Sequence, residues 1–528
     1  MFEEYRRNGW WREQTFLDDL ARGVAATPDK TALVIRRIAD AATDTLTYAE
    51  LDRVSERIAH GLVHLGVRRG DFVAVQLPNR WEMLPLTLAC IRIGARIAPQ
   101  MQLYRHRELD FMVRLTGAKV FVTMNTIGEL PTADTALRLA ADIPTLEHVV
   151  VLGGDGPEGT LSFEEHLLSA PPADLAGLAL GPDEPFLILF TSGTTGEPKG
   201  ALHSQNTLYA AIRGYAEAYG LDDSLVIMTS NAAMHYVGLV MTHLTAVTLG
   251  GTAVAADAWE PGAYLDLAAE HGVTMYYASP PHAREITEEQ EARPRDLSSL
   301  RVFVSGSAPV PPYLVEKCRT VLGVRVYALW GMTENGGVTM TRPQDPPERA
   351  GESDGSVVPG MEIRIVDEEL KPAEEGALQV RGASQCLGYY LREEIYAKSI
   401  TRDGWFDTGD LARDDGHGGI RITGRTKDVI VAKGCFKLPV SDMEALLGRH
   451  PAIRDIALIG LPDPTLVELV CAVVTPSGAA PALEDVRAFM RDAGVNETFW
   501  PERLEVIETM PRTPTGKIRK VELRERFG

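Results

Sequence analysis

The sequence has few cysteines, and they lie far apart. Only five occur among the 528 residues, at positions 90, 318, 386, 435 and 471, and no two have C-x-x-C spacing. An odd number of scattered cysteines argues against a disulfide framework and against a zinc site. The composition therefore fits a protein of the reducing cytoplasm.

Long apolar runs and an excess of positive charge are also missing. No stretch of about 18 apolar residues occurs, so we expect no membrane span, and the N-terminal segment lacks the basic-then-apolar order of a signal peptide. The formal net charge is −20, which argues against a nucleic-acid surface because phosphates require a basic one. With 45% apolar and 24% charged residues, the chain has the composition of an ordinary globular protein.

The length and the pattern of the chain predict an α/β fold with more than one domain. A chain of 528 residues exceeds what a single hydrophobic core usually supports. Helical patterns alternate with short β-rich runs, which is typical of α/β layering. Thr47–Glu50 is a capping box that opens a helix running to about His64. Strands are expected at 72–77, 119–123 and 148–152.

The C-terminal part has a different pattern. Two strands, 420–423 and 429–431, are expected around a turn. They are followed by a helix from Ser441, strands near 456–460 and 469–474, a helix near 483–491 and a strand near 504–508. We therefore predict a boundary near Lys427, with one domain at 1–426 and a smaller one at 427–528.

The densest motif follows a short apolar strand, Phe186–Phe190. It reads TSGTTGEPKG, from Thr191 to Gly200. Its glycines let the backbone approach a ligand closely, and its hydroxyls, lysine and backbone N–H groups suit phosphate oxygens. The spacing is not that of a Walker A loop. The alternative, an ordinary Ser/Thr/Gly surface loop, does not account for so dense a run directly after a buried strand.

Two further strands end in polar loops. The strand at 301–304 is followed by Ser305–Pro309, and the strand at 324–329 is followed by a loop at Trp330–Glu334. Carboxyl ends of neighbouring strands in an α/β sheet meet at one edge, where ligands bind. The pattern therefore predicts a ligand crevice at this edge.

These motifs, in this order, resemble the adenylate-forming superfamily of acyl-CoA synthetases, carrier-protein-loading adenylation domains and firefly-type luciferases. The resemblance covers nearly the whole chain. Within the superfamily, Gln76–Gln100 and Arg105–Met112 are most similar to ligases for alicyclic or medium-chain carboxylates. The resemblance implies a large N-terminal domain of layered sheets and helices and a small, mobile α+β C-terminal domain that carries the catalytic lysine.

The resemblance also implies roles for residues in the strand-end motifs. ATP phosphates are expected at Thr191, Ser192, Gly193, Thr194, Thr195, Gly196 and Lys199. The adenine is expected against Gly306, Ser307 and Ala308. The acyl group and the nucleotide are expected along Trp330, Gly331 and Met332. Thr333 corresponds to the residue that contacts the α-phosphate and Glu334 to the Mg²⁺ ligand, although a glutamate considered alone is usually solvated.

Further site residues are implied in the later motifs. Asp410 corresponds to the ribose-binding aspartate, Ile422 to a residue beside the adenine, and Arg425 to one that contacts ribose and phosphate. Considered alone, Asp410 and Arg425 could equally form a surface ion pair. Lys517, in PRTPTGKIRK, corresponds to the catalytic lysine, whose ammonium stabilises charge between the attacking carboxylate and the α-phosphate.

His235 corresponds to the residue that opens or closes the acyl and thiol channel. The alternative interpretation is a histidine of the core. Tyr236 stands where aryl-acid relatives carry an asparagine, so a hydroxybenzoate substrate is disfavoured. The small and apolar residues at 237–239 favour an apolar acyl group.

The reaction implied is ATP-dependent conversion of a hydrophobic carboxylic acid (alicyclic, polycyclic or medium-chain) to acyl-AMP, followed by thioester formation. The expected cofactors are ATP, Mg²⁺ and coenzyme A. Gly434 matches the glycine beside pantetheine, but Cys435, Phe436 and Lys437 do not match the usual residues, and Val467 stands where glycine is common. Delivery of acyl-AMP to a carrier protein or a partner enzyme, such as an acyltransferase, is therefore the main alternative.

Two other classes stay open. A luciferase-like oxidase would require O₂ and emit light, and a non-catalytic nucleotide-binding protein would form no pyrophosphate. Intact Glu334, Asp410 and Lys517 argue against the second. The acid and the oligomeric state, a homodimer included, are not determined by the sequence.

Overall fold

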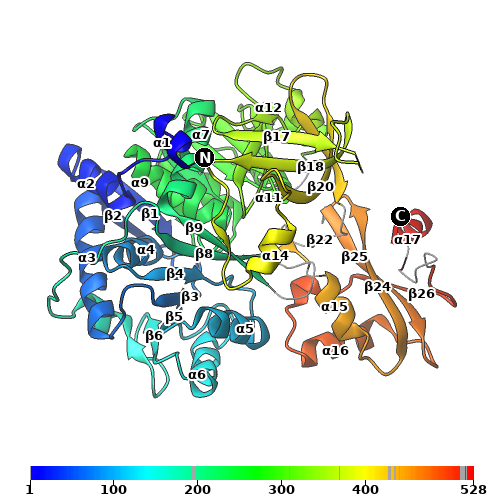
Figure 1. Ribbon diagram of the computed structural model, residues 1–528, viewed down its shortest axis with the longest axis horizontal. Coiled ribbons are helices and arrows are strands. Elements are labelled where there is room, and N and C mark those ends of the chain that lie inside the picture. The colour runs from blue at the N-terminus through cyan, green and yellow to red at the C-terminus, as the bar shows by residue number, and fades with distance from the viewer. Residues whose placement is uncertain are drawn as a thin grey trace.

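A computed structural model describes the chain except for residues 1, 192–197, 308–309, 368, 426–429, 433–435, 439, 466, 512–517 and 519. For residues 424, 425, 432, 437, 441, 442, 445, 467 and 521 it describes the backbone only. A large body formed by the first four-fifths of the chain carries a smaller group of C-terminal elements at one side (Figure 1).

A nine-stranded mixed sheet forms one half of the large body. Six neighbouring strands are parallel, and the pairs at both ends of the sheet are antiparallel. The strand order is β16 (Ser356–Val357), β15 (Gly336–Met340), β14 (Val326–Met332), β13 (Val302–Gly306), β12 (Met275–Ala278), β10 (Val226–Thr229), β11 (Thr252–Ala256), β1 (Thr31–Arg36) and β2 (Thr43–Thr47).

An eight-stranded sheet forms the other half. It is parallel except at one edge, where β9 and β19 run antiparallel to their neighbours. The strand order is β19 (Gly388–Tyr389), β9 (Lys199–Ser204), β8 (Pro185–Thr191), β4 (Arg96–Pro99), β3 (Phe72–Val75), β5 (Val120–Met124), β6 (His148–Leu152) and β7 (Leu161–Ser162).

Helices cover both sheets. They are α1 (Phe2–Arg7), α2 (Phe16–Ala26), α3 (Tyr48–His64), α4 (Met83–Arg92), α5 (His106–Thr116), α6 (Thr132–Asp142), η1 (Glu164–Leu168), α7 (Gln205–Tyr219), α8 (Tyr236–Gly238), η2 (Leu239–Leu244), α9 (Thr245–Leu249), α10 (Pro261–Glu270), α11 (Pro280–Ala292), α12 (Pro312–Val321), α13 (Arg349–Glu352) and α14 (Glu393–Lys398).

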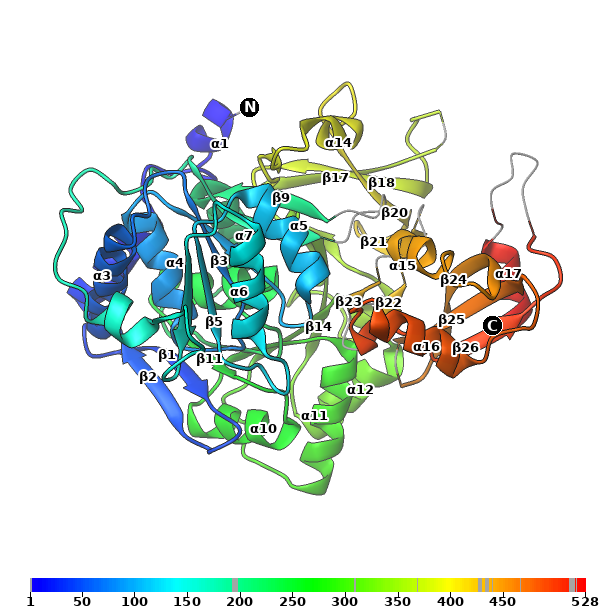
Figure 2. The same cartoon turned by 90° about the horizontal axis from the view of Figure 1, so that it is seen from below.

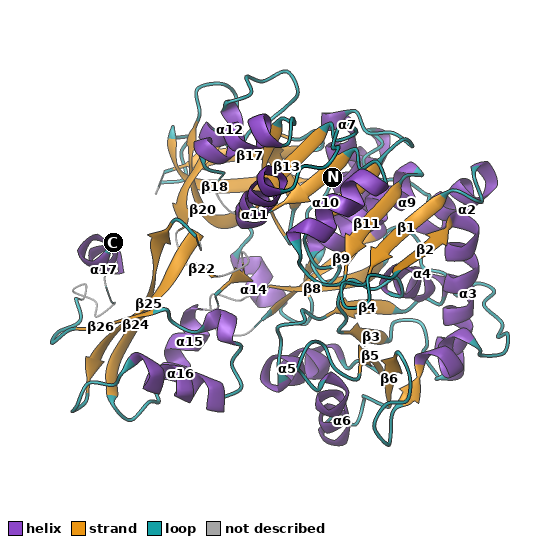
Figure 3. Ribbon diagram, turned by 180° about the vertical axis from the view of Figure 1, so that it is seen from behind, coloured by secondary structure: helices purple, strands orange, loops and turns teal. Residues whose placement is uncertain are grey.

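Three hydrophobic clusters lie between these layers and pack them together. The first joins the facing sides of the two large sheets with α3, α4, α7 and η2 between them. The second packs α10, α11 and α12 on the outer side of the nine-stranded sheet (Figure 2). The third packs α5 and α6 on the outer side of the eight-stranded sheet (Figure 3). Because both sheets are covered on both faces, their strands are apolar runs, as parallel sheets require.

A smaller antiparallel sheet completes the large body. Its order is β17 (Met361–Val366), β18 (Glu375–Gly382), β20 (Phe406–Asp414) and β21 (Ile420–Arg425). The C-terminal part contains β22 (Val431–Ala432), β23 (Phe436–Lys437), α15 (Val440–Leu447), β24 (Ile453–Asp463), β25 (Val467–Pro476), α16 (Leu483–Asp492), η4 (Glu497–Phe499), β26 (Arg503–Val506) and α17 (Lys520–Phe527). It has its own hydrophobic clusters.

Much of the predicted pattern is confirmed. The Thr47–Glu50 capping box is present, and its helix ends at His64. Ser204 caps α7 directly after the β8–β9 hairpin, because its hydroxyl accepts a hydrogen bond from the N–H of Thr207. We call β8 and β9 the phosphate-loop hairpin, after the ligand that its motif predicts. The α/β fold, with a large N-terminal domain and a smaller C-terminal one, is likewise confirmed. Among the described residues, no helix is long and apolar enough to cross a membrane.

Two local predictions are wrong. Trp330–Met332 is not a loop, because β14 continues to Met332 and pairs with β15 through Gly336. Among the residues that the structure describes, the strands predicted around a turn near 424–428 do not pair with each other. Instead β21 pairs with β20, and β22 pairs with β23. Periodicity predicts a strand but not its partner, and here each strand pairs with its neighbour away from the expected turn, β21 with the preceding β20 and β22 with the following β23. The predicted boundary at Lys427 lies outside the described residues.

Candidate active site

Three strand ends meet near the phosphate-loop hairpin. Thr191 ends β8 and Lys199 begins β9, and these two residues are register partners in the antiparallel hairpin. The turn that follows β14 approaches the same hairpin, because Thr191 Oγ1 lies 3.4 Å from Glu334 Oε1. The structure therefore brings together the predicted motifs at Thr191–Gly200 and Trp330–Glu334.

Glu334 is buried at this junction, with a relative exposure of 5%. The hydroxyl of Tyr389 donates a hydrogen bond of 2.8 Å to its Oε1. The backbone N–H of Cys386 donates one of 2.7 Å to its carbonyl oxygen. The Glu334 carboxylate is therefore buried and oriented by a hydrogen bond, unlike a solvated surface glutamate.

His203 fixes the residue that precedes Glu334. Its Nε2 lies 2.8 Å from the carbonyl oxygen of Thr333, and its Nδ1 lies 3.1 Å from Thr207 Oγ1. Burial lowers the pKa of His203 to about 4, so the ring is neutral at pH 7. Because a carbonyl only accepts, Nε2 carries the proton and Nδ1 is an acceptor. The single proton of the Thr207 hydroxyl is shared between Nδ1 and the carbonyl oxygen of Ser204, 2.9 Å away.

Tyr389 comes from an added edge strand. Its strand, β19, pairs with β9, with Tyr389 opposite Ala201. The ammonium of Lys199 lies 5.0 Å from the centre of the Tyr389 ring, within cation–π range. Burial, then the charge of Glu334, raises the pKa of Tyr389, so its hydroxyl remains a donor. We call Thr191, His203, Thr333, Glu334 and Tyr389 the Glu334 network.

The predicted ribose motif lies beside the end of β14. The indole N–H of Trp330 donates a hydrogen bond of 3.1 Å to Asp410 Oδ2, and Asp410 is buried. On the four-stranded sheet, Asp410 of β20 is the register partner of Arg425 of β21. The N–H of Ile422 donates to Asp354 Oδ2. Four predicted site residues are thus adjacent, and Asp410 is not on the surface.

Close backbone packing explains the glycines at these strand ends. A Cβ on Gly331 would lie 2.1 Å from the carbonyl oxygen of Gly336, and one on Gly306 would lie 2.5 Å from that of Leu329. Ser307 has φ +72°, a conformation that is unfavourable for a non-glycine residue. Strain of this kind is concentrated at functional loops. Met332 ends β14 and is partly buried.

His235 caps the short helix α8. Its Nδ1 accepts a hydrogen bond of 3.2 Å from the N–H of Val237. The ring is therefore oriented by its own helix, and Tyr236 is the first helical residue.

Several predicted site residues lie outside the described part of the chain. They are Ser192, Gly193, Thr194, Thr195, Gly196, Ala308, Gly434 and Lys517, and the side chain of Arg425.

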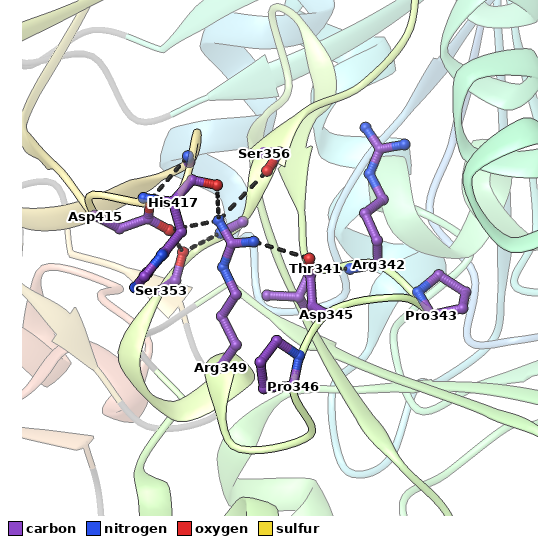
Figure 4. Close-up of polar contacts among 12 residues, drawn as sticks. Thr341, Arg342, Pro343, Asp345, Pro346, Arg349, Ser353, Ser356, Asp415 and His417 are labelled. Carbon is purple, nitrogen blue, oxygen red and sulfur yellow. Dashed lines mark hydrogen bonds and ion pairs between the residues drawn. The ribbon is translucent and has the colours of Figure 1, made fainter.

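A charged cluster anchors the sheet that carries Asp410. The guanidinium of Arg349 binds Asp345 at 2.8 Å and Asp415 at 2.7 Å, and the Ser353 hydroxyl donates to Asp415 at 2.5 Å (Figure 4). Burial alone would raise the pKa of Asp415, but the hydrogen bonds from Ser353 and Arg349 outweigh it and lower the pKa to about 2. We call Asp345, Arg349, Ser353 and Asp415 the Arg349 cluster. It ties the β20–β21 turn to the segment between β15 and β16.

Comparison with known protein families identifies both parts of the chain. Residues 20–390 match the model of the AMP-binding enzyme, and residues 442–517 match that of the AMP-binding enzyme C-terminal domain. The chain belongs to the AMP-binding enzyme family. It is therefore an ATP-dependent, adenylate-forming enzyme, as the motifs predict.

Individual AMP-binding enzymes are similar over nearly the whole chain. A medium-chain fatty-acid–CoA ligase of Escherichia coli is 30% identical over 99% of this chain and 92% of its own length. A salicyl-AMP ligase / salicyl-S-ArCP synthetase of Mycobacterium tuberculosis is 34% identical over 98% and 91%. A Rhodococcus jostii propanoyl:CoA ligase, whose named acyl group carries a methyl-dioxo-octahydro-indene ring system, is 33% identical over 91% and 93%.

A solved AMP-binding enzyme has the same fold. The amide bond synthetase of Marinactinospora thermotolerans superimposes with a TM-score of 0.83 at 26% identity, over 97% of this chain and all of that one. The resemblance to the superfamily and to its alicyclic and medium-chain ligases is confirmed.

The residues at Glu334 fit a magnesium ion that arrives with a nucleotide. Mg²⁺ is usually held by one or two carboxylates, with substrate phosphates and water completing its shell. Glu334 offers one buried carboxylate beside the phosphate-loop hairpin. Within the described part of the chain, no three His, Cys, Asp or Glu side chains form an all-protein metal site. A single buried carboxylate beside the β8–β9 hairpin therefore fits such an ion.

Sequence reasoning missed two members of the Glu334 network, His203 and Tyr389. Neither lies in a motif with an evident chemical pattern. Their contacts join residues 130 and 55 positions apart, so no local spacing could reveal them. The two tyrosines that follow Gly388 are a local signal for the added edge strand, because aromatic residues favour strands.

Proposed function

We propose that this AMP-binding enzyme activates a hydrophobic carboxylic acid (alicyclic, polycyclic or medium-chain) and then transfers the acyl group to coenzyme A. The observation that supports it most is the position of Glu334. This buried carboxylate lies next to the phosphate-loop hairpin and is oriented by Tyr389. A site that holds one desolvated negative charge beside phosphate-binding backbone is suited to a nucleotide–Mg²⁺ complex.

In the first half-reaction, a carboxylate oxygen of the acid attacks the α-phosphorus of ATP. The bond from that phosphorus to the bridging oxygen breaks, and pyrophosphate leaves. Thr191–Thr195 and Lys199 bind the departing phosphates, and Thr333 contacts the α-phosphate. Lys517 brings a positive charge to the reacting oxygens, and Mg²⁺ at Glu334 neutralises charge when bound. Catalysis of this kind rests on positioning and electrostatics.

Residues at the strand ends bind the ribose and the adenine of the nucleotide. Asp410 accepts hydrogen bonds from the ribose hydroxyls, with Arg425 on the neighbouring strand. Gly306, Ser307, Ala308 and Ile422 contact the adenine. The Trp330 indole, which donates to Asp410, holds that carboxylate in one orientation.

In the second half-reaction, the thiol of coenzyme A attacks the acyl carbon and AMP leaves. Gly434 allows the pantetheine arm to pass the backbone, and His235 controls its channel. The E. coli relative is named as a CoA ligase, which supports this acceptor.

A carrier protein is the second candidate acceptor. The segment around Gly434 departs from the usual pattern at Cys435, Phe436 and Lys437. The M. tuberculosis relative is named as a salicyl-S-ArCP synthetase as well as an AMP ligase. In this alternative, acyl-AMP forms normally, and free coenzyme A is a poor acceptor.

ATP–pyrophosphate exchange, with mass detection of products, tests the proposal. Aryl, fatty and polycyclic acids are compared with and without coenzyme A. Exchange with one class and formation of its acyl-CoA is the expected result, whereas accumulation of acyl-AMP would favour the carrier protein. Absence of exchange with every acid would contradict the proposal.

The variant Lys517→Ala should lower the exchange rate by about 10²–10³-fold, because it removes a positioned charge. Lys520→Ala is the control, since Lys520 pairs with Glu444 in the C-terminal part. Equal losses in the two variants would contradict the role of Lys517.

A further inference from the structure

Four buried polar side chains near the candidate site have no described hydrogen-bond partner. Three are tyrosines, and the fourth is an asparagine with a relative exposure of 0%. The atoms concerned are the hydroxyls of Tyr215, Tyr219 and Tyr236 and both amide atoms of Asn335. Burying such groups without a partner is unfavourable. A group of them close to a substrate site therefore indicates a missing polar partner.

Three of these side chains lie along one line. Tyr215 and Tyr219 are four residues apart on α7, so they share a helix face with Ala211. Their ring centres are 5.3 Å apart, and Tyr219 lies 5.0 Å from the ring of Tyr327. A Cβ built on Gly336 would be 3.0 Å from Ala211 Cβ and 2.7 Å from the Tyr236 hydroxyl. Tyr236 therefore extends the same line across Gly336.

This line begins at the Glu334 network. Asn335 and Gly336 directly follow Glu334, and Gly336 has φ +70°, which allows the chain to turn sharply there. The ring of Tyr236 packs edge-on against His203, with ring centres 5.6 Å apart. We call Tyr215, Tyr219, Tyr236 and Asn335 the tyrosine row. It runs from the turn after Glu334 along α7.

The surroundings of the row are apolar. The three tyrosines belong to the hydrophobic cluster between the two large sheets, which also contains Leu239, Val240, Leu329 and Val338. Burial raises the pKa of Tyr236, so its hydroxyl is neutral and can donate. The region thus offers hydrocarbon contacts together with hydroxyl donors and one amide that both donates and accepts.

We propose that the tyrosine row binds the acyl part of the substrate and that this acyl group carries a hydroxyl or keto oxygen on a hydrocarbon framework. The inference rests on the proposed function and narrows its substrate class. Tyr236 and Asn335 lie closest to the carboxyl end, and Tyr215 and Tyr219 lie further along the acyl group. An unsubstituted fatty acid leaves all of these polar atoms without a partner. A site built to hydrogen-bond an oxygen discriminates strongly against the analogue that lacks it.

Matched acid pairs test the proposal. Each pair has one ring-bearing acid with a single keto or hydroxyl group and the same acid without it. ATP–pyrophosphate exchange with the wild-type protein should show kcat/KM at least about 10-fold higher for the oxygenated member. In Tyr236→Phe, which removes one oxygen atom, the value for the oxygenated acid should fall about 10-fold, mainly through KM. The value for its partner should stay unchanged.

Tyr276→Phe is the matched control. Tyr276 is an equally buried tyrosine of β12, but its ring packs against Phe303 on the outer side of the nine-stranded sheet. Its removal should affect both members of a pair equally. Binding of the oxygenated acid, measured by calorimetry in the presence of a non-hydrolysable ATP analogue, should weaken in Tyr236→Phe and not in Tyr276→Phe.

The outcomes separate the two levels of the proposal. Equal exchange with both members of every pair, with no selective loss in Tyr236→Phe, overturns the inference and leaves the proposed function intact. Exchange with none of the acids overturns the proposed function and this inference with it. Selective loss in Tyr236→Phe for oxygenated acids alone supports both.

Discussion

The Glu334 network and the tyrosine row are neighbouring buried polar regions with opposite hydrogen bonding. In the network, the Glu334 carboxylate, the His203 ring and the Tyr389 hydroxyl all have protein partners. In the row, the hydroxyls of Tyr215, Tyr219 and Tyr236 have none among the described residues. The two regions touch where Tyr236 packs on His203.

The difference separates two uses of a buried polar group. A charged or ring-nitrogen group that has protein partners is held in one orientation, which a catalytic site needs before substrate arrives. A neutral hydroxyl without a partner is cheaper to leave unpaired than a charge, so it can remain available to a ligand. This difference supports our proposal that the network serves the chemistry and the row serves substrate recognition.

The largest expected effect comes from the charge in the network. Glu334→Gln keeps the size and the acceptor oxygen but removes the negative charge. The rate of ATP–pyrophosphate exchange should fall about 10²–10³-fold, with a higher requirement for Mg²⁺. A calorimetric titration of ATP at several Mg²⁺ concentrations provides a second readout. Exchange at the wild-type rate would contradict the proposal that the Glu334 network, unlike the tyrosine row, serves catalysis.

The Arg349 cluster extends the comparison to paired charges away from the ligand. Arg349→Met leaves Asp345 and Asp415 without their cation, so the free energy of unfolding should fall by about 3–5 kcal/mol. Urea denaturation measures it. The control is Arg319→Met, since the exposed pair of Arg319 with Glu316 should contribute no more than about 1 kcal/mol. Similar losses of unfolding free energy in both variants would show that the buried ion pairs stabilise the protein no more than an exposed pair does.

Acid should destabilise the protein through its buried histidines. Burial lowers the pKa of His203 from 6.5 to about 4, so the unfolded chain binds the proton more tightly. This contribution to stability is complete above about pH 6.5 and is lost as the pH falls towards 4, by at most about 3 kcal/mol.

The variant His203→Gln keeps a donor for the carbonyl of Thr333 but does not titrate. His243 and His282 are shifted to about 4 in the same way. The variant should therefore remove the contribution of His203 to the acid-induced loss of stability between pH 6.5 and 4 and leave those of His243 and His282. An unchanged pH profile, measured by chemical denaturation, would show that His203 does not titrate as the structure indicates.

The smallest effect is expected in the row itself. Tyr215→Phe removes a hydroxyl that has no described partner, so the free energy of unfolding should change by less than about 0.5 kcal/mol or increase. Tyr48→Phe is the matched contrast. The buried hydroxyl of Tyr48 lies 2.8 Å from the carbonyl oxygen of Gly251, and its loss should cost about 1–3 kcal/mol. Equal costs would imply a hidden partner for Tyr215.

Local signals predicted most of the elements but not how they pair. The capping box at Thr47 and the apolar run at 186–190 each specify one element through short-range physics. The sequence predicts the turn after β14 too early, because pairing with β15 extends the strand beyond its own apolar run. Even between consecutive strands, pairing depends on energies shared by two segments, which the pattern of one segment does not reveal.

The residues of the candidate site also fall into two groups, those that a sequence motif reveals and those that only the packing reveals. Glu334 and Asp410 were predicted because they lie in recognisable motifs, and the structure places both in buried positions. His203 and Tyr389 were missed because their roles arise only when distant strands meet. Tyr236 was noted as a departure from the aryl-acid pattern, but its unpartnered hydroxyl became visible only with the packing around Gly336.

The edge strand β19 also has a consequence for synthesis of the chain. Residue 389 leaves the ribosome 185 residues after β9 ends at residue 204, which takes about 10–40 s at typical elongation rates. During that interval β9 presents an uncovered strand edge, a known template for aggregation. The nascent protein should therefore be more prone to aggregation before residues 388 and 389 emerge and pair with β9 than afterwards.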